Sequence, residues 1–392
     1  MNLNFIKINF ENIFIFILLF LIFFSETIIL DTLIPAYLFI FFYLLINLTK
    51  IRISLFQLLS ILICIFYLFC LLFLSKENST LLVNFRYFFG FAIFLIFLRN
   101  FNFDEKHFFL FRLILFLICF YTIIEALFIN IYPDISLHQE IHTAKFFGFY
   151  TRSYGVGGNS TISSLSIIFL YYFIYKFFRK KISIYENILV LFSIFSLFST
   201  TGFIILCTII FFENLKFKNI DNFLKFFVVV FSLFLLIYAS TIIEGDHFQK
   251  ISSKYLKLII HDKLYWFKLA FGDIVIVNPE EIYFFKRYSE DILSIKECFN
   301  FFWGCQINDT INTSGDFAIK IFIIQNGILG LFPFLLLIFS FFKSKNYLIL
   351  LILISTTLHY GFVFSNIGHF ILPLFLIFTF KNYSIKKYNY DK

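Results

Sequence analysis

Long apolar runs, broken by short polar segments, follow one another along nearly the whole chain. Apolar runs of about 18 residues or more with few charges predict helices that cross a membrane. Such runs predict spans at roughly residues 11–30, 32–48, 54–74, 83–98, 108–131, 160–178, 187–199, 201–213, 225–243, 317–341, 347–363 and 366–380. The expected fold is therefore all-α: a polytopic membrane protein whose residues 1–392 form one integral membrane domain with about 12 transmembrane helices.

The apolar region at residues 187–213 fits either one long helix or two short helices that meet at Ser199–Gly202. Basic residues flank it on both sides, at Arg179–Lys181 and at Lys216–Lys225. Lys and Arg gather on the cytoplasmic side of membrane proteins. Because both flanks then lie on the same side, the chain should cross the membrane twice here, which favours two short helices.

With this choice the basic clusters and both termini are cytoplasmic, and two outward segments remain that are long. We call residues 132–159 the medium outer loop and residues 244–316 the large outer loop. The large outer loop contains the stretch SSKYLKLIIHDKLYWFKLAFGD, whose helical spacing of apolar residues predicts an amphipathic helix against the membrane. Loops of this length usually carry function.

The composition excludes a soluble protein, because 60% of the residues are hydrophobic, only 14% are charged, and the mean hydropathy is +0.90. In such a chain Lys and Arg first of all set topology, so the net charge of +8 does not make nucleic acid an expected partner. The outward histidines lack the spacing of metal ligands, and no cofactor is indicated. Cys298 and Cys305, in the large outer loop, fit either a small disulfide or two free thiols.

The charges within the apolar runs lie toward the ends that the topology places outside. A charge in the hydrocarbon costs about 2.5–3.5 kcal/mol on insertion scales, so each one needs a reason. Glu26, Arg86, Glu125 and Lys320 lie in the outer third of their spans, and Asp31, Arg152, Asp316 and His359 lie at or near the outer ends. This favours a polar cavity that opens outward over the midplane site typical of transporters. Local pairing of Arg86 with Glu125, and of Asp316 with Lys320, is the alternative.

The medium outer loop ends in TRSYGVGGN, directly before the span at 160–178. Glycines let the backbone approach a ligand closely, and N–H groups at the start of a helix favour anions. Arg152 would add a bidentate phosphate ligand. Arg152, Gly155, Gly158 and Asn159 are therefore candidate residues of an anion site, and a flexible loop with a helix cap is the alternative.

Several motifs follow one another in a recognisable order. After TRSYGVGGN comes a short helical hairpin with the tip FSTTG, and the large outer loop ends in a Gly-rich turn, Asp316 and NGILGLFPFLL. The last pair of spans reads LHYGFVFSNIGHFILPLFLIF. With the predicted topology, this order resembles the superfamily of O-antigen polymerases and O-antigen ligases of the bacterial envelope. The resemblance extends over most of the chain.

The resemblance implies glycan transfer from the lipid carrier undecaprenyl diphosphate at the periplasmic face of the inner membrane, without ATP or a nucleotide sugar. In a polymerase, a sugar hydroxyl of one lipid-linked glycan attacks the anomeric carbon of another. In a ligase, the acceptor is lipid A-core. The diphosphate leaves, and arginine suits its developing charge. The implied partners are the lipid-linked glycan, membrane lipid and a chain-length regulator protein.

Residue by residue, Arg152 matches the arginine of the medium outer loop. Arg287, the single arginine of the large outer loop, is the second diphosphate candidate, and Arg86 is a third because of its depth in the span. His261 matches the histidine that ligases place there and is a candidate general base, with His247 as its competitor. The context LIIHDKLYW differs from that of the ligases, which favours a polymerase. Asp316 completes the catalytic candidates, and Arg86 and His359 are expected to line the cavity and bind substrate.

Three other functions remain open. The closest is an O-antigen ligase. A polysaccharide flippase or other transporter also has about 12 spans, but its charges would face a central cavity. A glycosyltransferase that uses polyprenyl-phosphate sugars would carry paired acids in its first outer loop, where this chain has Asp31 with Glu26 below it.

Overall fold

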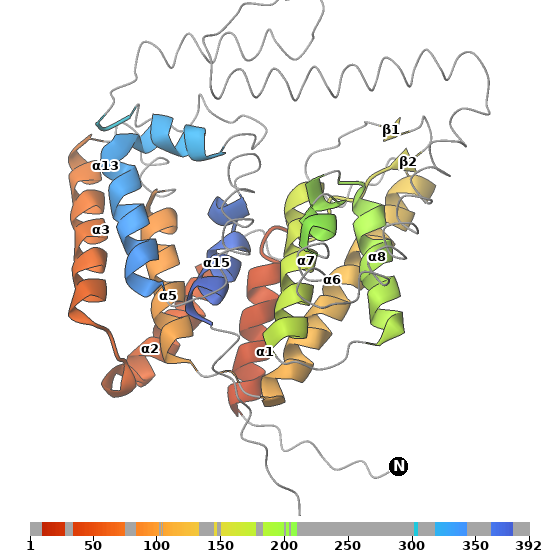
Figure 1. The fold of residues 1–392 in the computed structure, drawn as a ribbon, viewed down its shortest axis with the longest axis horizontal. Coiled ribbons are helices and arrows are strands. Elements are labelled where there is room, and N and C mark those ends of the chain that lie inside the picture. Colours follow the sequence, from red (N-terminus) through yellow and green to blue (C-terminus); the bar gives the residue numbers. More distant parts are fainter. Residues whose placement is uncertain are drawn as a thin grey trace, which may run out of the picture. The chain divides into compact units, whose positions relative to one another are not determined.

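The structure is a computed structural model, and it describes residues 10–27, 34–74, 84–101, 103, 105–132, 145–146, 150–177, 183–199, 201–203, 205–209, 302–304, 318–342 and 362–378. Most of these residues are helical (Figure 1), as the apolar runs predict. The chain divides into two compact units. The first comprises Met1–Ala144, Thr151–Gly202 and Ile295–Lys392, and the second Lys145–Tyr150 and Phe203–Ser294.

The named helices all belong to the first unit. They are α1 (Phe10–Phe23), α2 (Ile34–Ile46), the 3₁₀ turn η1 (Leu48–Lys50), α3 (Leu55–Leu74), the π-helical turn η2 (Arg86–Gly90), α5 (Phe91–Asn100), α6 (Glu105–Ile131), α7 (Ser160–Phe177), α8 (Ile184–Leu197), α13 (Ala318–Phe341), the 3₁₀ turn η5 (Phe362–Phe364) and α15 (Gly368–Ile377). Two short strands, β1 (Lys145–Phe146) and β2 (Tyr150–Thr151), pair with each other.

The described helices begin and end within a few residues of the predicted spans, except α1. The first span was predicted to reach residue 30, but α1 ends at Phe23. The hydroxyls of Ser25 and Thr27 donate to the carbonyls of Ile22 and Phe24, which closes a turn after the helix. Glu26 therefore lies in a turn and not inside a helix, which corrects its predicted position within the span.

Long-range packing in the first unit brings together helices that are far apart in sequence. The helix α13 packs along α3, and α15 packs against α5 and α7. The helix α6 contacts α1, α7 and α8, which lie beside it in Figure 1. The C-terminal helices are thus built in among the N-terminal ones.

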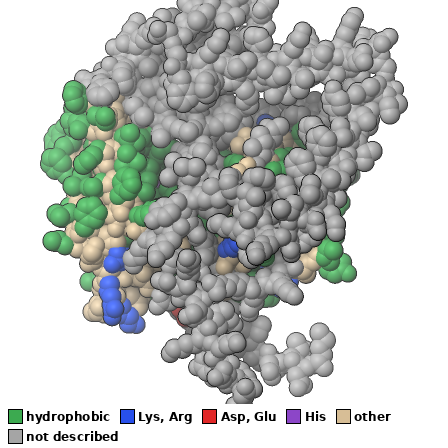
Figure 2. Space-filling view, in the orientation of Figure 1, with side chains coloured by type: hydrophobic (Ala, Val, Ile, Leu, Met, Phe, Trp, Pro, Cys, Tyr) green, Lys and Arg blue, Asp and Glu red, His purple; other side chains and the backbone are tan. Residues whose placement is uncertain are grey.

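Within the described residues, two helices are long and apolar enough to cross a membrane, Leu55–Phe73 and His107–Ile131. The first, in α3, exposes its large apolar side chains: Phe66 is 68% and Phe73 is 76% exposed. Its polar residues Gln57 and Ser60 are buried against α13. A water-soluble helix has the opposite arrangement, and Figure 2 shows apolar side chains over much of the described surface on this face. This arrangement is typical of a helix that faces lipid.

The apolar region at residues 187–213 breaks where the alternative of two helices requires it. The helix α8 ends at Leu197, and Phe198 has a left-handed φ of 46°. Helical residues begin again at Thr201. A Cβ at Gly202 would overlap the side chain of Ser164, so glycine lets the new helical segment approach α7 closely. The break is confirmed, and the count of 12 spans stays a prediction.

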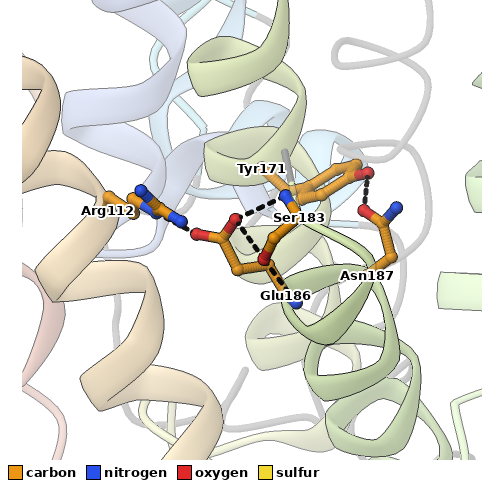
Figure 3. A network of polar contacts seen from close by, with 5 residues as sticks. All are labelled: Arg112, Tyr171, Ser183, Glu186 and Asn187. Carbon is orange, nitrogen blue, oxygen red and sulfur yellow. Dashed lines mark hydrogen bonds and ion pairs between the residues drawn. The ribbon is translucent and has the colours of Figure 1, made fainter. Parts of the chain in front are cut away.

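One end of α6, α7 and α8 is tied together by a small polar network (Figure 3). Arg112 of α6 forms an ion pair with Glu186 of α8. Ser183 and Glu186 form a capping box that starts α8. Beside it, the Tyr171 hydroxyl donates to Asn187 Oδ1 at 2.6 Å. The charge pattern predicts that this end faces the cytoplasm, and we call it the inner end.

Candidate functional site

Polar side chains are also buried at the opposite end of the same helices, which we call the outer end. Glu125, near the C-terminus of α6, is fully buried there. Its Oε2 accepts hydrogen bonds from the Ser153 hydroxyl and, at 2.6 Å, from the Gly155 N–H. A buried carboxylate is costly unless it is hydrogen-bonded. These bonds therefore hold the end of the medium outer loop against α6.

The backbone of Arg152 is anchored on both sides. Before it, the amide side chain of Asn130 accepts from the Thr151 N–H and donates to the Thr151 carbonyl, both at 2.8 Å. After it, the Ser153 N–H donates to the Ser196 carbonyl at 3.1 Å. The Arg152 side chain is partly exposed between these anchors. A cation in this position has a fixed backbone and a side chain that solvent can reach.

The glycine-rich turn that follows is buried over residues 153–157. The Ser163 hydroxyl donates to the Tyr154 carbonyl at 2.6 Å and accepts from the Gly157 N–H at 2.8 Å. Gly155 has a φ of +67°, and a Cβ there would lie 2.7 Å from Ser163 Cβ. Its N–H donates to the Glu125 carboxylate, so Gly155 shapes the turn, and its contact with substrate stays a prediction.

Asn159 caps α7, as the loop-with-cap alternative predicts. Its Oδ1 accepts from the Thr161 N–H at 2.8 Å, and its carbonyl accepts from the Ser163 N–H. The preceding Gly158 has a φ of +62° and is exposed. A Cβ at Gly158 would lie 3.6 Å from Glu26 Oε2. The turn thus lies beside the partly exposed carboxylate at the end of α1.

Glu26 joins three segments that are distant in sequence. Its Oε1 accepts a hydrogen bond from the backbone N–H of Asn366, 340 positions away, at 3.2 Å. Asn366 lies between η5 and α15 and is 7% exposed. Its Oδ1 and the hydroxyl of buried Ser160 have no hydrogen-bond partner among the described residues. Buried polar atoms in this state are rare and call for a ligand or water.

A second buried polar group lies near Arg86. The Tyr37 hydroxyl is 3.1 Å from His369 Nδ1, and His369 is fully buried between the rings of Tyr87 and Phe91. Gly90 makes room for Tyr37, since a Cβ there would lie 2.5 Å from its ring and hydroxyl. In the described part of the chain, Arg86 Nε and His369 Nε2 are buried without a hydrogen-bond partner.

The start of α13 holds the end of the large outer loop. The helix breaks at Gly327, which has φ 62° and ψ −169°. Into this break fits Phe302, whose carbonyl accepts from the Leu329 N–H at 3.1 Å. Trp303 stacks on Tyr67 of α3, whose hydroxyl donates to Asn326. The point where the large outer loop returns to the helices is therefore fixed in space.

The candidates from the sequence divide into two groups. Arg86, Arg152, Gly155, Gly158 and Asn159 lie at the outer end of described helices. The others lie outside the described residues, as do both outer-loop cysteines: Arg287, His261, His247, Asp316, His359, Cys298 and Cys305. No group of three potential metal ligands occurs among the residues that the structure describes.

Sequence reasoning missed Tyr37, Asn130, Asn366 and His369. A signal was present for the last two, because SNIGH is a polar interruption in an otherwise apolar C-terminal region. Tyr37 and Asn130 carry no comparable signal. Tyr is common in this chain, and Asn130 stands at a helix end, where polar residues are usual.

Comparisons of the chain with protein-family models, with curated proteins and with solved structures return no match. The geometry of the outer end and the sequence pattern therefore carry the functional argument.

Proposed function

We propose that this chain is a multi-span inner-membrane glycan polymerase with both termini in the cytoplasm. It joins oligosaccharide repeat units carried on undecaprenyl diphosphate at the periplasmic face, and a chain-length regulator is a further partner. The proposal rests on the resemblance of the ordered motifs. It is supported by the position of Arg152, whose neighbours Thr151 and Ser153 are held at the outer end by Asn130 and by the buried carboxylate of Glu125.

The observation that carries the proposal is this anchoring of Arg152. Transfer of a glycan from a lipid diphosphate develops negative charge on the leaving group. A cation stabilises that charge best when it needs no reorganisation during the reaction. Asn130 and Ser196 hold the backbone on both sides of Arg152, and its side chain remains partly exposed. Arg152 therefore takes the role of the main diphosphate ligand.

Arg86 takes the role of a further cation in the proposal, beside Arg152 and Arg287. It lies in the π-helical turn η2, and its guanidinium carbon is 5.4 Å from the centre of the Tyr87 ring. π-helical turns occur often at functional sites. Arg287, His261 and Asp316 of the large outer loop complete the proposed catalytic set, with Asn159, Gly158 and His359 in substrate contact.

The test is the surface-glycan ladder of a strain that lacks this chain. A polymerase leaves single repeat units on the core and no ladder. A bare core with polymer retained on undecaprenyl diphosphate identifies a ligase, and an unchanged ladder refutes both and favours a transporter or another polymer.

Complementation with Arg152→Ala then tests the residue. We expect the rate of polymer formation to fall by about 100-fold or more, with normal amounts of protein in the membrane. Arg52→Ala is the matched control, since Arg52 is exposed at the inner end. Polymer of ordinary length from Arg152→Ala would exclude its role at the diphosphate.

A further inference from the structure

Building on the proposed function, we propose that Glu26, Asn366 and the turn at Gly158 form the subsite for the acceptor sugar hydroxyl, with Glu26 as the general base. The sequence places these residues at the end of the first span, before the sixth and in the last pair of spans. The structure brings them into contact. No general base among the described residues was assigned from the sequence.

The two oxygens of Glu26 have different surroundings. Oε1 accepts from the Asn366 N–H, which fixes the direction of the carboxylate. Oε2 faces Gly158, an exposed residue without a side chain. The carboxylate is thus oriented through Oε1 and is partly exposed beside the glycine. A general base needs this combination of fixed geometry and access.

The neighbouring groups suit sugar hydroxyls. Asn366 Oδ1 and Ser160 Oγ are buried and lack partners within the described residues. An amide oxygen accepts hydrogen bonds, and a serine hydroxyl donates and accepts them, which matches the donor and acceptor groups of a sugar. Both belong to segments that contact Glu26, because Asn366 binds it directly and Ser160 follows Gly158 by two positions. A bound sugar would supply the missing hydrogen bonds.

In the proposed step, the acceptor hydroxyl loses its proton to Glu26 as its oxygen bonds to the anomeric carbon of the donor glycan. The bond from that carbon to the diphosphate oxygen breaks, and the electron pair leaves with undecaprenyl diphosphate. Arg152 and Arg86 neutralise the new charge. Glu26 then releases its proton to water, so that atoms and charges balance without a further reactant.

The experiment uses the purified full-length chain with undecaprenyl-diphosphate-linked repeat units as both donor and acceptor. Glu26→Gln keeps an oxygen for the Asn366 N–H but cannot take a proton. We expect its kcat to fall by about 100-fold or more, with KM within about threefold of the parent. Formate should restore part of the turnover of Glu26→Ala, which a merely structural role would not allow. Glu11→Gln is the matched control, an exposed glutamate in the first turn of α1, the helix that ends shortly before Glu26.

The outcomes separate this inference from the function on which it rests. A parent chain that does not polymerise overturns the proposed function, and this subsite falls with it. If the parent polymerises and Glu26→Gln keeps its kcat, the general base lies elsewhere while the function stands. Loss of turnover together with a lower melting temperature and no rescue by formate assigns Glu26 a structural role and also overturns the inference.

Discussion

Alanine substitutions at Gly327 and Gly158 can separate the cost of backbone strain from the cost of steric overlap. Gly158 and Gly327 both have a φ of +62°, which L-residues adopt only at a cost. A Cβ at Gly158 meets nothing closer than 3.6 Å. A Cβ at Gly327 would overlap the Phe302 carbonyl and lie 2.7 Å from the Gly304 nitrogen. Alanine is strained at both positions, but only Gly327→Ala must displace residues 302–304.

The expected difference follows from these contacts. Strain alone should lower the free energy of unfolding of Gly158→Ala by about 1–2 kcal/mol. The ψ of −169° places Gly327 in a region nearly confined to glycine, where strain is about 1–3 kcal/mol. Displacing Phe302 also removes its hydrogen bond with Leu329, about 1 kcal/mol, and the stacking of Trp303, about 0.5–1.5 kcal/mol. We expect a loss of about 3–5 kcal/mol for Gly327→Ala.

The free energy of unfolding can be measured by SDS titration in mixed micelles. The chain has 2 tryptophans, so a Trp266→Phe background leaves Trp303 as the single emitter at the contact with Tyr67. We expect Trp303 of folded Gly327→Ala to become more exposed to quenchers than in Gly158→Ala. Equal losses of stability in the two variants, or unchanged Trp303 quenching, would refute the reasoning that residues 302–304 are held in the break.

Two further predictions concern the two ends of α6. Burial acts to raise the pKa of Glu186, but hydrogen bonds from Arg112 and Ser183 outweigh it, and the pKa lies below its ordinary value. The stabilisation by the ionised Glu186 is therefore present at neutral pH and is lost as the pH falls below that ordinary value. In Glu186→Gln, the free energy of unfolding should fall less steeply below about pH 5, and the difference should be about 1 kcal/mol or less because the pair is partly exposed. Parallel acid profiles of the variant and the parent would contradict this. At the outer end, Asn130→Ala removes both bonds to Thr151 and should lower polymer formation about 10-fold by releasing the backbone of Arg152. Asn47→Ala, which removes a bond at the inner end, serves as its control, and equal turnover in the two variants would count against the anchoring of Arg152.

The positions of the helices could be predicted from sequence because an apolar run depends only on residues that are neighbours along the chain. The structure places most described helices within a few residues of the apolar runs, and the basic flanks were enough to predict the break after α8. The end of α1 was predicted wrongly, because the apolar run continues while Ser25 and Thr27 turn the backbone. Hydrogen bonds of this kind depend on individual side chains and do not show in a hydropathy averaged over many residues.

The partners of the polar residues could not be predicted, because they depend on tertiary contacts. The charge pattern indicated that Glu26, Arg86 and Glu125 lie toward one end and favoured a polar cavity there, with a pair between Arg86 and Glu125 as the alternative. In the structure Glu125 binds Ser153 and Gly155, and Glu26 binds the backbone of Asn366. Nothing in the local sequence of Glu26 indicates a partner 340 positions away.

The contrast between the two ends of the helices explains why we assign the chemistry to the outer one. At the inner end, the network of Figure 3 closes consecutive helices on one another, with a cap, an ion pair and satisfied hydrogen bonds. At the outer end, hydrogen bonds join residues 259 to 340 positions apart, and buried polar atoms in the described segments still lack partners. Long-range bonds also join α3 to α13 at Gln57 and Ser60, so they do not by themselves mark the outer end, but unsatisfied buried atoms weaken the fold. Such an arrangement persists where it serves to position groups for a ligand.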